Sequence, residues 1–285
     1  MAEKEKEAQD IWTRILNIDV RVFYWACLII LALPLIFPFT LPIVVTEPTR
    51  AAFNTIQSLP EGSLVLYYME CGVGGWPELM GSMVASLKHI YAKRLKFVIV
   101  NIGYSVDHKL TFDRIFSLAG HPSARGYKYG EDWAYFGFAS GMETAMASLA
   151  KNFRSVYRED DFGTSIDQLP IMRNVNEAKD FKLVLCFNTA GGQSWVRAHW
   201  TVANKVPSII AVIGAGLAQS QSDFKAGMNS GFWFSTRGAA EYEGLLKAPG
   251  ISSARMSALD TMQLVTILCV IAANFAFQMS KRRKK

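Results

Sequence analysis

Two long stretches without a charged side chain constrain this chain more than any other feature of its sequence. Residues 23–46 and residues 261–279 contain no Asp, Glu, Lys or Arg. At 1.5 Å per residue, helices of these lengths reach roughly 36 Å and roughly 28 Å, against ~30 Å for the hydrocarbon core of a bilayer. The residues between them contain no other run of this kind. The sequence therefore predicts a membrane protein with two transmembrane helices.

The charges beside these stretches predict their orientation. The basic tail SKRRKK follows the second stretch directly, and Arg14 and Arg21 precede the first. Because Lys and Arg favour the cytoplasmic side, we expect both termini in the cytoplasm. The residues between the spans then lie on the periplasmic or extracellular side of a cell (inner) membrane. A cleaved signal peptide is the alternative for the first stretch. The long preceding region of mixed charge and the lack of an A-x-A site disfavour it.

These features divide the chain into five predicted parts. Ile11, Ile15, Ile18 and Val22 recur at helical spacing, which predicts an amphipathic helix on the cytoplasmic surface or a simple extension of the first span. The five parts are a cytoplasmic segment 1–22, a transmembrane helix 23–46, an α/β domain 47–257, a second transmembrane helix 258–279 and a basic tail 280–285.

Between the spans, short apolar runs alternate with helical patterns. Continuous apolar runs are typical of parallel strands buried on both faces. We therefore expect an α/β domain with a doubly wound, mostly parallel, Rossmann-like or flavodoxin-like sheet. The predicted strands are 63–70, 95–102, 133–138, 180–189, 206–214 and 231–235, and the predicted helices are 47–58, 76–93, 106–119, 141–153, 193–204, 217–228 and 237–248.

Two segments of the domain are predicted to be irregular. Residues 122–132 are polar and aromatic and are expected to be exposed. Residues 154–175 are longer, and they end in the apolar run Leu169-Pro170-Ile171-Met172. Long loops in compact domains usually bind something or are disordered. The apolar ending favours a segment that docks on a partner, with a disordered surface loop as the alternative.

The loops after the predicted strands are rich in glycine. Ligands of parallel α/β sheets bind beyond the carboxyl ends of the strands, where small residues let backbone N–H groups approach an anion. The candidate ligand-binding residues are Gly72, Gly74, Gly75, Gly191, Gly192, Ser194, Gly214 and Gly216. Tight turns also need glycine without any ligand. Neither CGVGGW nor GAGLAQ completes the G-x-G-x-x-G pattern, and no P-loop occurs, so we expect no cofactor.

Few residues suggest catalysis. His108 lies in a favourable loop beside Asp107, and with Glu143 it forms the candidate catalytic set of a hydrolase. Asp107 is equally suited to cap the following helix. The four cysteines occur singly, without metal-ligand spacing, so no metal site is expected. Cys71 and Cys186 form either one disulfide or two buried thiols.

The charge pattern does not predict nucleic-acid binding. The net charge is +6, but the last five residues, KRRKK, contribute +5 of it. Residues 47–257 hold 21 Lys and Arg against 18 Asp and Glu, without a basic stripe that interleaves aromatic residues. The expected partners are instead the lipid bilayer and other membrane subunits or copies of this chain.

The spans themselves suggest helix partners. Gln263, Asn274 and Gln278 are predicted to lie on one face of the second span. Polar side chains in hydrocarbon need hydrogen-bond partners, and prolines in a membrane helix free carbonyl groups that lipid cannot satisfy. Helix-packing residues are therefore predicted in both spans: Pro34, Pro38, Pro42, Gln263, Asn274 and Gln278.

Three functions remain open from the sequence. The first is a non-catalytic, membrane-anchored structural or assembly subunit of a larger membrane complex, which the lack of a catalytic pattern and the polar face of the second span favour. The second is a ligand-binding or sensory module that uses the glycine-rich loops. The third is a membrane-anchored hydrolase.

Overall fold

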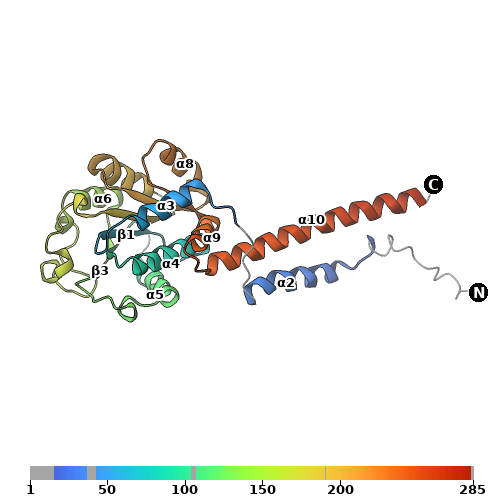
Figure 1. Cartoon of the computed structure of the whole chain (residues 1–285), viewed down its shortest axis with the longest axis horizontal. Coiled ribbons are helices and arrows are strands. Elements are labelled where there is room, and N and C mark those ends of the chain that lie inside the picture. Colours follow the sequence, from blue (N-terminus) through green and yellow to red (C-terminus); the bar gives the residue numbers. More distant parts are fainter. Residues whose placement is uncertain (1–15, 37–42, 104–106, 190, 284–285) are drawn as a thin grey trace, which may run out of the picture. The chain divides into compact units, whose positions relative to one another are not determined.

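The computed structural model of this chain describes residues 16–36, 43–103, 107–189 and 191–283. The chain divides into two compact units (Figure 1). One comprises residues 42–253, and the other comprises residues 1–41 and 254–285. The larger unit contains the sheet, and the smaller one contains one apolar helix and most of a second.

The larger unit is built on one sheet of six parallel strands in the order β3-β2-β1-β4-β5-β6. The strands are β1 Leu64–Glu70, β2 Lys96–Ile102, β3 Trp133–Ala139, β4 Leu183–Asn188, β5 Ser208–Val212 and β6 Phe232–Phe234. This order is that of the Rossmann fold and differs from the flavodoxin order, in which strand 2 lies at the edge. The prediction of a parallel α/β domain is confirmed, and the order of the strands is Rossmann-like.

Helices cover both faces of the sheet because each central strand is apolar on both sides. In β1, Val65, Tyr67 and Met69 point into one core, while Leu66 and Tyr68 point into the other. The first core also contains side chains of α3 (Glu47–Gln57), α4 (Trp76–Ala92), α5 (His108–Ala119) and α9 (Ser235–Leu245). The second contains side chains of α6 (Met142–Lys151), α7 (Gly192–Val196), the π-helical turn Arg197–Val202 and α8 (Leu217–Lys225).

Other parts of the chain contact the sheet at both edge strands. At β6, helix α3 lies directly on the backbone of Gly231, where an added Cβ would be 2.5 Å from the Ala52 nitrogen. At β3, the register shifts between Ile99 and Asn101 of the neighbouring strand, and Gly137 has a φ of +66°. The Asp161 N–H then donates to the carbonyl of Tyr135.

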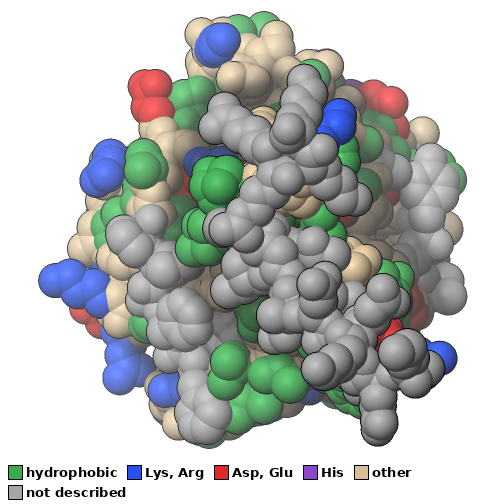
Figure 2. All heavy atoms as spheres, turned by 90° about the vertical axis from the view of Figure 1, so that its right-hand side faces the viewer, with side chains coloured by type: hydrophobic (Ala, Val, Ile, Leu, Met, Phe, Trp, Pro, Cys, Tyr) green, Lys and Arg blue, Asp and Glu red, His purple; other side chains and the backbone are tan. Residues whose placement is uncertain are grey.

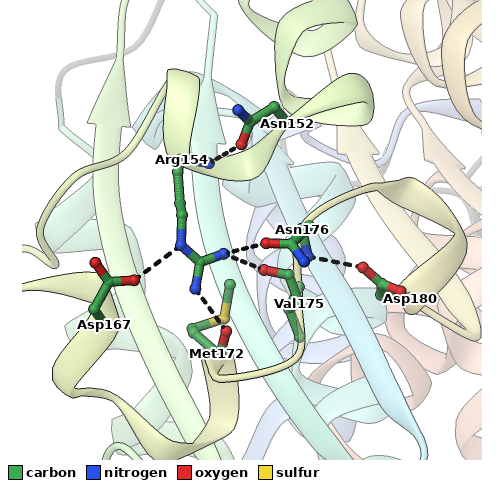
Figure 3. A network of polar contacts seen from close by, with 7 residues as sticks. All are labelled: Asn152, Arg154, Asp167, Met172, Val175, Asn176 and Asp180. Carbon is green, nitrogen blue, oxygen red and sulfur yellow. Dashed lines mark hydrogen bonds and ion pairs between the residues drawn. The ribbon is translucent and has the colours of Figure 1, made fainter.

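The segment 154–175 is neither disordered nor free to dock on a partner, which corrects the expectation from sequence. Its apolar residues Ile166, Leu169, Ile171 and Met172 are buried in the second core of the domain. Arg154 holds the segment together (Figure 3). Its guanidinium pairs with Asp167 at 2.9 Å and donates to Asn176 and to the carbonyls of Met172 and Val175.

The segment 122–132 is also less exposed than predicted. Tyr127 is buried in the first core, and its hydroxyl donates to the carbonyl of Ile90 at 3.1 Å. The Tyr129 hydroxyl donates to Asp160 at 2.7 Å. The tyrosines of this loop therefore anchor it to the domain, and Lys128 between them is exposed.

A buried histidine joins three helices on the first face of the sheet. His89 of α4 has its Nδ1 2.6 Å from the hydroxyl of Tyr242 on α9 and its Nε2 2.9 Å from Oε1 of Gln57 on α3. A neutral ring satisfies both contacts, with Nε2–H donating to Gln57 and Nδ1 accepting from Tyr242. Burial, followed by the nearby charge of Lys93, lowers the pKa of His89 to about 4.

We expect His89 to make the domain sensitive to mild acid. Because its pKa is about 4 in the folded chain and near 6.5 in the unfolded chain, the unfolded state binds more protons between these values. The contribution of His89 to the free energy of unfolding is therefore fully present above pH ~6.5 and falls as the pH drops towards 4. The expected loss at pH 5 is about 2 kcal/mol. Unfolding free energies measured at pH 7.5 and 5 should show this loss in the wild type and lack it in His89→Gln. The exposed-site control His121→Gln should retain it, and equal losses in all three proteins would contradict this role.

The smaller unit contains two apolar helices. Helix α10 (Ile251–Arg283) is, within the described part of the chain, the one helix long and apolar enough to cross a membrane, over Ile251–Lys281. Helix α2 (Val20–Ile36) is also apolar but has only 17 residues, and its backbone stays helical through Pro34. The predicted amphipathic residues Ile11 and Ile15 lie outside the described residues, as do Pro38 and Pro42. The second predicted span thus has a matching helix, and the described part of the first is shorter than predicted.

Candidate functional site

The carboxyl edge of the sheet at β1 and β4 is the candidate site. These two strands are neighbours, and the strand order reverses between them, which is where ligands of such sheets bind. The glycine-rich loops that follow them, 71–76 and 188–194, therefore lie at the same edge, as the sequence predicted. Whether a ligand has space at this edge depends on the side chains that lie there.

A buried carboxylate lies at the end of β1. Glu70 is only 3% exposed, and its Oε2 accepts a hydrogen bond from the N–H of Thr189 at 3.1 Å. An added Cβ on Gly103, at the end of β2, would be 2.6 Å from the Glu70 Cγ. Asn188 at the end of β4 is equally buried and donates to the carbonyl of Ala211. Side chains of the chain itself therefore fill the point where the strand order reverses.

Two further carboxylates accept hydrogen bonds from backbone N–H groups at this edge. Asp107 Oδ2 accepts from the N–H of Val73 in the loop after β1, at 2.8 Å. Glu78 Oε2 accepts from the N–H of Gly214 in the loop after β5, at 3.1 Å. In dinucleotide-binding sheets, N–H groups of the loop after the first strand bind phosphate. Here the N–H groups of Val73 and Gly214 bind carboxylates, whose negative charge also repels phosphate.

The candidate glycines fall into two groups. An added Cβ on Gly75 would be 2.5 Å from the Cys71 sulfur, and one on Gly216 would be 2.9 Å from the Val212 Cβ. Gly191 and Gly192 are similarly enclosed, by Trp195 and by the Tyr68 hydroxyl. These four glycines are explained by close packing. Around Gly74 and Gly214 there is open space, whereas Gly72 and Ser194 are partly exposed, with Ser194 in the first turn of α7.

The three candidate catalytic residues have separate partners. Glu143 lies on α6, which packs on the second face, and it contacts His199 at 3.1 Å. His108 begins α5 on the first face, and its Nε2 is 3.7 Å from Asp161. Asp107 precedes α5 but makes no side-chain cap, because its carboxylate binds Val73. Sequence reasoning missed Asp161, since nothing local connects it to His108.

Several polar atoms on this edge are buried without a hydrogen-bond partner among the described residues. They are both amide atoms of Asn101, Oδ1 of Asp107 and Nδ1 of His108. Asn101 is the next-to-last residue of β2 and, like Glu70 and Asn188, is a buried polar residue near the carboxyl end of a strand. In folded proteins such groups usually bond to a buried water.

The cysteines do not form a disulfide. Cys71 lies in the first core and Cys186 in the second, on opposite faces of the sheet, and both are free thiols. Burial, reinforced by the charges of Glu70 and Asp107, raises the pKa of Cys71 to about 12. Because only the thiolate is a nucleophile, Cys71 is chemically inert at neutral pH. Of the two interpretations from sequence, the structure shows buried thiols.

The polar residues predicted for helix packing are exposed on α10. Gln263, Asn274 and Gln278 all face outward. Asn274 Nδ2 donates to the Val270 carbonyl of its own helix at 2.8 Å, which leaves its oxygen and its second N–H available for a neighbour. Eleven residues make three turns of an α-helix, so Gln263 and Asn274 lie on the same face.

Neither the surface charges nor the potential metal ligands among the described residues indicate a further site. On the face shown in Figure 2, Lys and Arg side chains are interspersed with Asp, Glu and hydrophobic ones. Among the described residues, no group of three or more His, Cys, Asp or Glu could hold a metal ion.

No model of a known protein family, no curated protein and no solved structure matches the chain.

Proposed function

We propose that this chain is a non-catalytic, membrane-anchored structural or assembly subunit of a larger membrane complex. The observation that carries the proposal is the outward-facing polar side of α10. Gln263, Asn274 and Gln278 project from a helix that has no charged residue between Asp260 and Lys281. Amide side chains in hydrocarbon are stabilised by partners on other helices, and the helix of another subunit would supply them.

The carboxyl edge of the sheet supports this proposal over its alternatives. A module that binds phosphate or a dinucleotide needs free N–H groups, and those of Val73, Thr189 and Gly214 bind carboxylates of the chain. A hydrolase built from His108 and Glu143 needs them within hydrogen-bond reach of one substrate, but their helices cover opposite faces of the sheet. The domain is therefore better suited to a structural role than to catalysis.

In this proposal residues 23–46 form a second span and the domain lies on the periplasmic or extracellular side. The charges that predict this arrangement are Arg21 before α2 and the basic residues that end α10. Epitope tags at both termini should resist protease added to intact cells. Digestion of either tag would contradict the orientation.

The triple variant Gln263→Leu, Asn274→Leu and Gln278→Leu should weaken assembly. Interhelical hydrogen bonds in membranes contribute about 0.6 kcal/mol each, so losing three lowers association by roughly 20-fold. The matched control is Thr266→Leu, because the Thr266 hydroxyl already donates to the Met262 carbonyl of its own helix at 2.9 Å. Co-purification of partners in mild detergent measures both. Equal recovery with the triple variant and the wild type would contradict the role of this face.

A further inference from the structure

One face of α10 carries three amide side chains and two branched apolar ones. Gln263, Ile267, Val270, Asn274 and Gln278 follow one another at steps of four, three, four and four residues. Since an α-helix has 3.6 residues per turn, all five lie within about 80° of one another around the helix. Alternating steps of four and three residues also separate the contact positions of coiled coils. These five residues, the amide face, therefore have the pattern of a helix–helix contact.

The described part of the chain leaves the amide face open. All five side chains are exposed, including the apolar ones, with Ile267 at 57% and Val270 at 55%. Asn274 lies seven residues before Lys281, which is roughly 10 Å along the helix axis. Gln263 follows Asp260 by only three residues, and Gln278 precedes Lys281 by three. In a bilayer that α10 spans, Asn274 is thus the amide that lies in hydrocarbon, and the two glutamines lie near its borders.

The free hydrogen-bonding groups of Asn274 are complementary to those of an identical side chain. Its Nδ2 uses one N–H for the carbonyl of Val270, at 2.8 Å. One N–H and the Oδ1 oxygen remain, which is one donor and one acceptor. Leaving them unpaired in hydrocarbon is unfavourable. Two such amides that face each other pair through two reciprocal N–H···O bonds.

A second copy of the chain presents this amide at the same depth in the membrane. Every copy ends in the same basic tail, SKRRKK, so all copies insert in one orientation and their α10 helices run parallel. A two-fold axis between two copies then places each residue opposite itself. Asn274 meets Asn274 of the other copy, and each glutamine meets its equivalent. A different subunit would instead need its own polar residue at each of these three depths.

We propose that two copies of this chain pair through the amide faces of parallel α10 helices. Asn274 of each copy donates to and accepts from Asn274 of the other, while Ile267 and Val270 pack on both sides of the contact between the helices. A single Asn in the seam of a two-stranded coiled coil fixes the register in the same way. This inference rests on the assembly function proposed above and names a second copy as the partner.

Disulfide cross-linking of full-length chains in native membranes tests the pairing. In a background of Cys27→Ala and Cys269→Ala, the remaining cysteines are buried in the domain. Val270→Cys, on the amide face, should give a disulfide-linked product of twice the mass of one chain when a membrane-permeant oxidant is added. Ala272→Cys is the matched control, because two residues turn the helix by about 200° and place this exposed position on the opposite side.

The possible results separate this inference from the assembly function. No doubled product with Val270→Cys, or equal yields with Val270→Cys and Ala272→Cys, would overturn the pairing of copies through this face. If the native mass of the extracted protein nevertheless exceeds that of one chain, the assembly function stands with another protein as the partner. A native mass of one chain would contradict the assembly function itself.

Variants of Asn274 test the reciprocal amide pair. Asn274→Leu removes both hydrogen bonds and should lower the association of two differently labelled copies by about eightfold, measured as energy transfer in lipid vesicles. Leucine favours the membrane more than asparagine does, so α10 still spans. Asn274→Gln keeps one donor and one acceptor and should retain most of the association. Equal energy transfer in Asn274→Leu and the wild type would refute the role of Asn274.

Discussion

Replacing Gly231 with alanine should destabilise the domain by about 3 kcal/mol or more. Gly231 precedes β6 with a φ of +149°, and an added Cβ would lie 2.5 Å from the Ala52 nitrogen and 2.7 Å from the Pro48 oxygen. These are backbone atoms of α3 and cannot turn aside, so the helix must move away from the sheet edge. The conformational strain adds about 1–3 kcal/mol to the overpacking cost of a similar size. Chemical denaturation of the full chain in nanodiscs measures the loss.

Gly227→Ala is the matched control for this effect. Gly227 also has a positive φ, +69°, but no atom lies within 4 Å of its added Cβ. Only the backbone strain of about 1 kcal/mol is then expected. If the two variants lose the same unfolding free energy, the contact between α3 and Gly231 does not cause the expected extra loss in Gly231→Ala.

Replacing Glu243 with alanine should cost about 3 kcal/mol. This buried carboxylate of α9 accepts from the N–H groups of Gly250, Ser252 and Ser253 and from the Ser253 hydroxyl, at 2.6–3.2 Å. It thus binds the first turn of α10, where free N–H groups and the helix dipole favour a negative charge. Its removal leaves buried donors without an acceptor, which costs about 1–3 kcal/mol per group before relaxation.

Two companion variants separate charge from hydrogen bonding. Glu243→Gln keeps one acceptor oxygen and loses the charge, so an intermediate loss is expected. Glu61→Ala removes an exposed carboxylate and should change the unfolding free energy by less than about 0.5 kcal/mol. The same denaturation measurement applies to all three. Full stability in Glu243→Ala would show that water replaces the carboxylate at the start of α10.

The sequence predicted those parts of the fold that depend on local pattern. Runs such as residues 97–100 are apolar on both faces, and a strand buried on both faces requires that pattern. The same reasoning located all six strands, although β6 has only three residues. It could not choose between the Rossmann and flavodoxin orders, because strand order depends on which distant strands pair.

The errors concern contacts between residues far apart in the chain. Residues 154–175 look like an exposed loop, and only the tertiary structure shows that Ile166, Leu169 and Met172 are buried in the second core of the domain. The carboxyl edge is similar. The glycine-rich loops were visible in the sequence, but the N–H groups of Val73 and Gly214 in them donate to Asp107 and Glu78, which lie far from them along the chain.

The contacts of the buried histidine were equally hidden. His89 looks like an ordinary helical residue until Gln57 and Tyr242 are placed beside it. Sites assembled from separate elements need the tertiary structure before their chemistry can be inferred.

The most direct test of the proposed assembly function is the mass of the intact protein extracted from its native membrane. Native mass spectrometry after mild-detergent extraction measures it without any variant. If the chain is a subunit of a membrane complex, the mass should exceed the 31.7 kDa of one chain by that of at least one further copy or another protein. A uniform species of one chain, with detergent and lipid alone, would contradict the proposal.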